Sequence, residues 1–179
     1  ATFPIGRNLS KNILTCLDQI VPASNLHKIG RISVAIGPGG FTGTRLSIVL
    51  ARTLAQQLDC DLDGVSSFAL MAPRLANALT PNQRSLPFWI TKELPRRGLI
   101  AGKYQIKKNS NIEEILELKR PHLLPPNRKV APFIKASDKV DEDVIQMLKL
   151  TLIKYKENKK NSWHQVLPIY PTSPVEKYK

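Results

Sequence analysis

Apolar side chains recur every three or four positions near the start of the chain. Between residues 8 and 21 this stripe consists of Leu9, Ile13, Leu17 and Ile20. Such spacing puts the four side chains on one side of a helix, and the following Pro22 is typical of a helix end. The pattern therefore predicts an amphipathic helix over residues 8–21.

The next sixty residues alternate between short β-branched runs and longer helical stripes. A strand is indicated by a compact apolar run, and a helix by apolar residues at intervals of three or four. The predicted elements are a strand over 31–36, a helix from Thr42 or Gly43 to Leu58, a strand over 61–65 and a helix from Ser66 or Ser67 to about Leu79.

The second half of the chain is less regular. Two apolar runs flank Pro95-Arg96-Arg97-Gly98, which predicts a β-hairpin with a four-residue loop. The helix over 140–158 is expected to turn Val144, Met147, Leu148, Leu152 and Tyr155 inward. The other predicted elements are a short helix over 111–118, a loop over 121–132, a strand over 133–134 and an edge strand over 166–170.

Helices and strands are thus mixed in both halves, which is typical of an α/β protein. Residues 80–85 are polar and turn-like, so we expect a lobe boundary there. The predicted lobes are residues 1–80 and a smaller α/β lobe over 81–179.

The chain has 179 residues and a formal net charge of +13. Residues 91–179 contain 19 basic and 10 acidic groups, so most of the excess lies in the second half. A positive field favours a polyanion such as RNA. The sequence has no RNP pattern or helix-turn-helix signal, however, so a lysine-rich composition is the favoured explanation of the charge. Cys16 and Cys60 stand alone, which suits a reducing compartment. With no membrane-span pattern, we expect a cytoplasmic protein.

A glycine-rich stretch, Gly37-Pro38-Gly39-Gly40, lies between the first strand and its helix, and Gly43 follows. A Walker loop requires a lysine here, and a dinucleotide fingerprint requires a glycine where Thr42 stands. Unpaired amides at the helix start could still attract an anion. These residues are therefore interpreted first as a structural turn.

The helix after the turn has an apolar arc of about 200°. We expect Leu46, Leu50 and Leu54 to face the sheet, with Ile48, Ala51 and Ala55 on the flank. Small residues four apart allow close approach of another helix. That helix is either the one over 8–21 or one from a partner, and the residues alone leave both open.

No catalytic constellation is evident elsewhere. His27, His122 and His164 are isolated, and neither serine at 66–67 lies in a nucleophile elbow. The alternating acids Asp59, Asp61 and Asp63 lack the glycine and glutamate of a calcium loop. The sequence predicts no catalytic, cofactor or metal site.

The run GPGGFTGTRLSIVLARTLAQQLDCDLDGVSS, residues 37–67, resembles the signature of the bacterial TsaB (YeaZ) family. The family pattern is GPGSFTGLR, a helix, a second strand and GVSS, from which this chain departs at Gly40 and Thr44. The resemblance implies an actin-like ATPase-related fold (ASKHA, RNase H-like) with two lobes. It also implies a non-catalytic role in making threonylcarbamoyladenosine in tRNA.

The catalytic relative, TsaD, has an HxxxH metal pair just after the second strand. This chain has Ser67 and Met71 at those positions, and neither side chain replaces imidazole for iron or zinc. The resemblance therefore implies a scaffold that binds TsaD, and through it a TsaE-type ATPase and tRNA, or a second copy of itself. An ASKHA-type nucleotide-binding enzyme or a glycopeptidase-like hydrolase is the alternative.

In the family, two helices pair with those of TsaD as a four-helix bundle. The interface residues expected on this basis are Ile13, Leu17, Ile20, Ile48, Ala51, Arg52 and Ala55. The family begins with a phosphate-binding β-hairpin, and this chain starts after the corresponding point. We therefore expect that about 25–35 residues before Ala1 are absent, a number judged from the size of a typical sheet. They are absent either from the gene or only from this chain.

Overall fold

The computed structural model describes residues 1–109 and 112–171 and divides the chain into two compact units. Unit 1 contains Ala1–Val65 and Val140–Pro168, and unit 2 contains Ser66–Lys139 with the residues from Ile169 onward. These units differ from the predicted lobes, 1–80 and 81–179, on both sides of the expected boundary. The helix after residue 66 packs on the second sheet, and the helix after residue 140 packs on the first.

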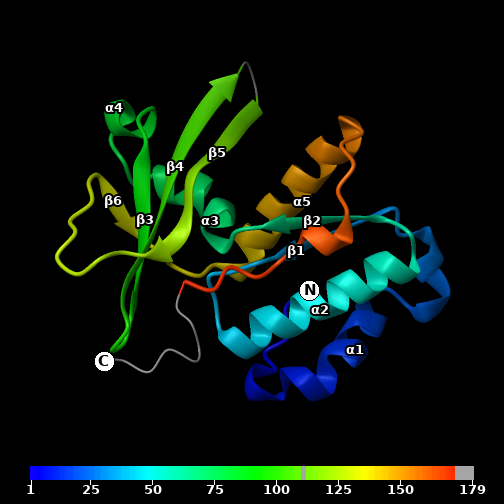
Figure 1. Cartoon of the computed structure of the whole chain (residues 1–179). Helices are drawn as coiled ribbons and strands as arrows, with labels where there is room; N and C mark the ends of the chain where they lie inside the picture. The colour runs from blue at the N-terminus through cyan, green and yellow to red at the C-terminus, as the bar shows by residue number, and fades with distance from the viewer. Residues whose placement is uncertain (110–111, 172–179) are drawn as a thin grey trace. The chain divides into compact units, whose positions relative to one another are not determined.

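Unit 1 is a two-stranded parallel sheet with a helix on each face. Its elements are η1 (Gly6–Asn8), α1 (Leu9–Ile20), η2 (Ala23–Lys28), β1 (Arg31–Ala35), α2 (Phe41–Gln57), β2 (Asp61–Val65), α5 (Val140–Lys156) and η3 (Trp163–Gln165). Figure 1 shows α2 and α1 on one side of the strands and α5 on the other. The predicted helices and strands between residues 8 and 65 are confirmed, within one or two residues at each end.

The two faces of this sheet differ in chemistry. Because side chains alternate along a strand, Ile32 and Val34 point to one face and Arg31 and Ser33 to the other. The apolar face is covered by α2, whereas Ser33 Oγ lies 2.6 Å from Thr151 Oγ1 on α5. The helix α5 therefore packs on a polar surface.

This polar surface explains why the expected inner face of α5 is wrong. Of the five residues predicted to turn inward only Met147 is half-buried, and it shares a face with Thr151 and Lys154. Threonine and lysine suit a surface formed by polar and charged side chains. The exposed residues are Val144, Leu148, Leu152 and Tyr155.

Unit 2 is a four-stranded sheet in the order β5-β4-β3-β6, with α3 packed on β4 and β5. Its elements are α3 (Ser67–Ala76), α4 (Pro81–Arg84), β3 (Phe88–Leu94), β4 (Gly98–Asn109), β5 (Ile112–Leu123) and β6 (Phe133–Lys135). The Ser66 side chain caps α3 by accepting a hydrogen bond from Ala69 N at 3.1 Å. The 133–134 strand is confirmed, and so is the capped helix, although it ends at Ala76 and not near Leu79. The hairpin is also confirmed, but its loop has three residues, Pro95–Arg97, because Gly98 pairs with Leu94.

In the second half, the predicted helix over 111–118 and the predicted strand over 166–170 are wrong, and the predicted loop over 121–132 begins only after Leu123. Residues from Ile112 onward form β5 instead of a helix, because pairing with β4 outweighs local propensity. The strand continues through Pro121 into the expected loop, which an edge strand tolerates. Residues 166–170 form no strand; η3 precedes them. No helix in the described part of the chain is long and apolar enough to cross a bilayer.

Candidate functional site

The glycine stretch joins β1 to α2 by a tight turn. Gly37 has a φ of +94°, a conformation that favours glycine, and Ile36 N donates to Val65 O at 2.9 Å. Gly40 stands at the N-cap of α2, and its carbonyl accepts from Thr44 N at 2.9 Å. A Cβ on Gly43 would lie 3.6 Å from Leu9 Cδ2, so α1 passes close to the start of α2. Gly37 and Pro38 are buried and Gly39 is exposed.

The buried face of α2 is the one that was predicted from the sequence to lie on the flank of the helix. Ile48, Ala51 and Ala55 are buried in unit 1, whereas Leu46, Leu50 and Leu54 are only partly covered. The small alanines let the helix lie close to the strands, which the larger leucines would prevent. The prediction that the leucines face the sheet is therefore wrong. The three buried residues are not available to a partner in this conformation.

The other residues expected at an interface lie nearer the surface. Ile13 and Leu17 on α1 are half-buried and Ile20 is 54% exposed. Arg52 on α2 is half-buried, and its guanidinium carbon lies 5.5 Å from the centroid of the Trp163 ring. Leu14 on α1 is 64% exposed and lies beside the stripe, about 100° from Ile13 and about 60° from Leu17 around the helix.

A cluster of charges lies on the α5 side of the unit 1 sheet. Asp63 is 1% exposed and accepts hydrogen bonds from Arg31 Nη1 at 2.9 Å and Lys154 Nζ at 3.1 Å. The side-chain amide of Asn161 donates to the same carboxylate. Arg31 Nη2 also lies 3.1 Å from Asp61 Oδ2. The register pairs Arg31 with Asp61, which explains how one guanidinium reaches both acids.

These contacts set the ionisation of Asp63. Burial acts to raise its pKa, but the hydrogen bonds from Arg31 and Asn161 and the charge of Lys154 outweigh burial and hold the pKa below its usual value. The sequence indicated only an alternating acidic segment here. Arg31 lies 32 residues from Asp63 and Lys154 lies 91 residues from it, so spacing along the chain could not have found the cluster.

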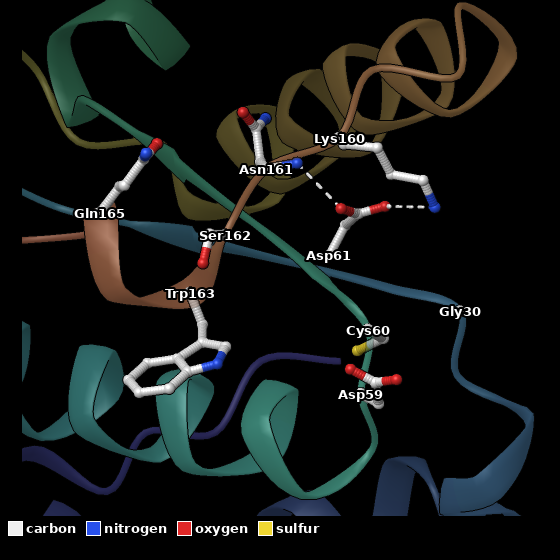
Figure 2. A pocket seen from close by; sticks show the side chains of 9 residues that line it. All are labelled: Gly30, Asp59, Cys60, Asp61, Lys160, Asn161, Ser162, Trp163 and Gln165. Carbon is white, nitrogen blue, oxygen red and sulfur yellow. Dashed lines mark hydrogen bonds and ion pairs between the residues drawn. The ribbon is translucent and has the colours of Figure 1, made fainter.

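A polar cavity of about 560 Å³ opens beside this cluster (Figure 2). Asp61 accepts a hydrogen bond from Asn161 N at 2.8 Å, and Lys160 Nζ lies 3.8 Å from the same carboxylate. Burial, together with the charges of Asp61 and Asp59, raises the pKa of the Cys60 thiol. The thiol is therefore not an activated nucleophile at neutral pH. The lining residues are Gly30, Asp59, Cys60, Asp61, Lys160, Asn161, Ser162, Trp163 and Gln165.

In unit 2, three polar side chains meet beneath α3. Tyr104 Oη donates to Glu117 Oε1 at 2.8 Å and lies 3.0 Å from Ser66 Oγ. Burial, and secondarily the Glu117 charge, raises the pKa of Tyr104 far above its usual value. Ser66 also donates to Glu117 at 2.6 Å while it caps α3, so the cluster anchors the helix to the sheet.

Ser67 and Met71 lie four residues apart on α3, with Met71 buried. Across residues 1–109 and 112–171, no group of three or more His, Cys, Asp or Glu side chains could hold a metal ion. His27 is exposed, His122 contacts the Trp89 ring and His164 contacts the Trp163 ring. The three histidines do not come together.

Comparisons with known proteins match this chain to a TsaD family model, to a TsaB protein and to YeaZ structures. Residues 5–90 match the family model described as TsaD: tRNA N6-adenosine threonylcarbamoyltransferase. The chain is 46% identical over 89 residues to the tRNA threonylcarbamoyladenosine biosynthesis protein TsaB of Bacillus subtilis strain 168. That match spans 49% of this chain and 35% of the relative's length.

Two solved structures from Pseudomonas aeruginosa share the fold. YeaZ superposes with a TM-score of 0.63 at 21% identity, covering 95% of this chain and 88% of that one. A protein described as uncharacterized with similarity to peptidase YEAZ gives a TM-score of 0.61 at 21% identity, covering 93% and 84%. These findings confirm the resemblance to the TsaB (YeaZ) group and its ASKHA-type α/β fold.

Proposed function

We propose that this chain takes part in the biosynthesis of threonylcarbamoyladenosine in tRNA, as a non-catalytic subunit that binds a TsaD-type threonylcarbamoyltransferase. The observation that carries the proposal is the 46% identity to TsaB over 89 residues. The structure forms a continuous unit of β1, α2 and β2 within residues 5–90, the segment that matches the TsaD family model. Sequence identity at this level supports a common role more strongly than the fold does, since one fold serves many functions.

The non-catalytic role is supported by the side chains on α3. Ser67 and Met71 occupy the two positions at which the catalytic relatives carry metal-binding histidines. A hydroxyl and a thioether are poor ligands for iron or zinc, so this helix would not hold the metal that the transfer requires. The chain would instead support the enzyme that holds the metal.

The proposed partner surface is the exposed side of α1 and α2. Ile13, Leu17 and Ile20 form a stripe along α1, which a helix pair from a partner could cover. Arg52 on α2 remains part of the proposed interface, at the border of this surface. Ile48, Ala51 and Ala55 contribute indirectly, because their burial holds α2 against the strands. Through TsaD, the chain would meet a TsaE-type ATPase and tRNA, and the same surface would allow a homodimer when the partner is absent.

The surface is tested by mixing the chain with its cognate TsaD-type protein and measuring mass by size-exclusion chromatography with light scattering. We expect a one-to-one complex. Ile20→Glu places a charge within the stripe and should weaken binding by more than about tenfold, because a charge buried at an interface without a partner is costly. Ala51→Glu is unsuitable, since Ala51 is buried and the variant would disturb folding.

Leu14→Glu is the matched control. It introduces the same charge on the same helix, at a residue that is more exposed and lies outside the stripe. We expect its affinity for the partner to stay within about threefold of the wild type. Equal weakening by both variants would show that the surface is wrongly placed on α1. No complex with the wild-type chain would refute TsaD binding itself.

A further inference from the structure

One face of the unit 2 sheet gathers basic and aromatic side chains. The pairing register aligns Lys119 on β5, Lys103 on β4, Trp89 on β3 and Phe133 on β6 in one row across the sheet. The next row contains His122, Ala101, Thr91 and Lys135. Residues paired in register point to the same side, so both rows lie on the face opposite α3 and Tyr104. The β4–β5 register shifts on both sides of Lys103, but Lys119 and His122 remain paired with Lys103 and Ala101. We call this the lysine–aromatic face.

Several contacts fix the side chains of this face. Lys103 Nζ lies 5.8 Å from the centroid of the Trp89 ring, and the His122 ring lies 6.3 Å from Trp89. Trp89 and Ala101 form a small core with Leu124, against which Val130 packs. Phe133 lies at the edge of the face and is 54% exposed.

The three lysines of this face are not neutralised by ion pairs within the part of the chain that the structure describes. Among the described residues, Lys103, Lys119 and Lys135 form no ion pair, and Lys119 and Lys135 are exposed. Lys103 and Lys119 stand directly opposite each other, an arrangement that destabilises an isolated sheet. A bound polyanion would remove that cost.

The surroundings are also basic. The segment Ser66–Lys139 contains 14 basic and 5 acidic residues, a net +9 of the chain's +13. Arg128 and Lys129 are exposed on the loop that Val130 anchors beside the face. By strand alternation Glu93 and Glu114 lie on the same face, but near its two ends. The middle of the face is left positive.

We propose that the lysine–aromatic face binds RNA directly, with the lysines contacting phosphates and Phe133 stacking on an unpaired base. Charge complementarity selects a polyanion, and an exposed ring in the same row as two lysines selects one that has bases as well as phosphates. The identification of that polyanion as RNA rests on the proposed function. The binding requires only unit 2 side chains, so it does not depend on TsaD.

The test measures binding of the full chain to a fluorescein-labelled tRNA transcript, with an adenosine 3′ of the anticodon, by anisotropy at several KCl concentrations. The patch variant is Lys103→Gln, Lys119→Gln and Lys135→Gln combined. Each lost phosphate contact lowers the slope of log K against log salt by about 0.7–0.9, so we expect a slope smaller by roughly 2–3 and an affinity at least about tenfold weaker. Phe133→Leu should weaken binding by about tenfold without changing the slope.

The matched control is Lys11→Gln, Lys149→Gln and Lys156→Gln combined, three exposed lysines of unit 1. It removes the same charge and should leave affinity within about twofold. A variant with Lys103→Arg, Lys119→Arg and Lys135→Arg combined keeps the charge and should bind the transcript as the wild type does. Equal loss in the control, an unchanged salt slope in the patch variant, or no binding by the wild-type chain would overturn the proposal.

The patch variant should still form the complex with a TsaD-type partner. If RNA binding fails while that complex forms, the lysine–aromatic face is refuted and the proposed function stands. If the face binds tRNA but no partner complex forms, TsaD binding is refuted and the inference about the face stands.

Discussion

The Asp63 cluster makes a strong prediction about the stability of unit 1. Asp63→Asn keeps the shape of the side chain but removes its negative charge. Breaking a buried ion pair typically costs about 3–5 kcal/mol, because the remaining charge is left without compensation. The cost is reduced here for two reasons. Arg31 is 5% exposed but still pairs with Asp61 at 3.1 Å, and Lys154 is 31% exposed, so that water can solvate its ammonium group. We therefore expect unfolding of unit 1 to require about 2–4 kcal/mol less free energy than in the wild type.

Fluorescence can report on unit 1 alone. The chain has two tryptophans, Trp89 in unit 2 and Trp163 in unit 1. With Trp89→Phe in every protein compared, urea unfolding followed through Trp163 measures the unit that contains Asp63. The predicted loss corresponds to a midpoint lower by more than about 1 M urea.

Asp59→Asn is the control for this experiment. Asp59 is exposed and has a φ of +48°, which asparagine tolerates, so its replacement should change stability by less than about 0.5 kcal/mol. A loss below about 1 kcal/mol for Asp63→Asn, or an equal loss in both variants, would refute the argument that the buried carboxylate holds Arg31 and Lys154.

Two further predictions follow from the same packing and charges. The pKa of Asp63 is lowered from 3.8, so its contribution to stability is complete above that pH and is lost as the pH falls through the lower folded value. The urea midpoint of the wild type should therefore fall more steeply below about pH 4 than that of Asp63→Asn. Parallel curves would contradict a stabilising role for the ionised Asp63. Gly102→Ala would place a Cβ 2.9 Å from the buried ring of Tyr104, so thermal melting should show unit 2 destabilised by about 1–3 kcal/mol. Gly30→Ala meets nothing within 4 Å and should melt like the wild type.

Local patterns predicted the first half of the chain well, because its signals agree with one another. The apolar run over 31–36, the glycine turn and the serine cap each specify the same order of strand and helix. The second half lacks this agreement. Residues 112–118 have helical spacing and several charges, yet they belong to β5 because β4 lies beside them and pairs along their length.

The orientation of helices was harder to predict than their existence. The size of Leu46, Leu50 and Leu54 suggested that they face the sheet, but close packing favoured the small side chains of Ala51 and Ala55. On α5 the apolar stripe faces away from β1, since that side of the strand carries Arg31 and Ser33. Both errors arise because the pattern of a helix does not show the size and polarity of the side chains on the sheet surface that it packs against.

The polar clusters could not be found from spacing. Asp63, Arg31, Lys154 and Asn161 come from three separate parts of the chain, and only the fold brings them together. The lysine–aromatic face likewise depends on the strand register. The motif over residues 37–67, in contrast, is continuous, and it identified the relatives from sequence alone.

The most direct test of the proposed function is the formation of N6-threonylcarbamoyladenosine in tRNA by a reconstituted system. The product would be quantified with the cognate TsaD-type enzyme alone, with this chain alone and with both, the other components of the pathway being present throughout. We predict product only when both proteins are present, loss of product with Ile20→Glu and normal product with Leu14→Glu. Product formed at the same rate without this chain, or by this chain without the enzyme, would contradict a supporting, non-catalytic role.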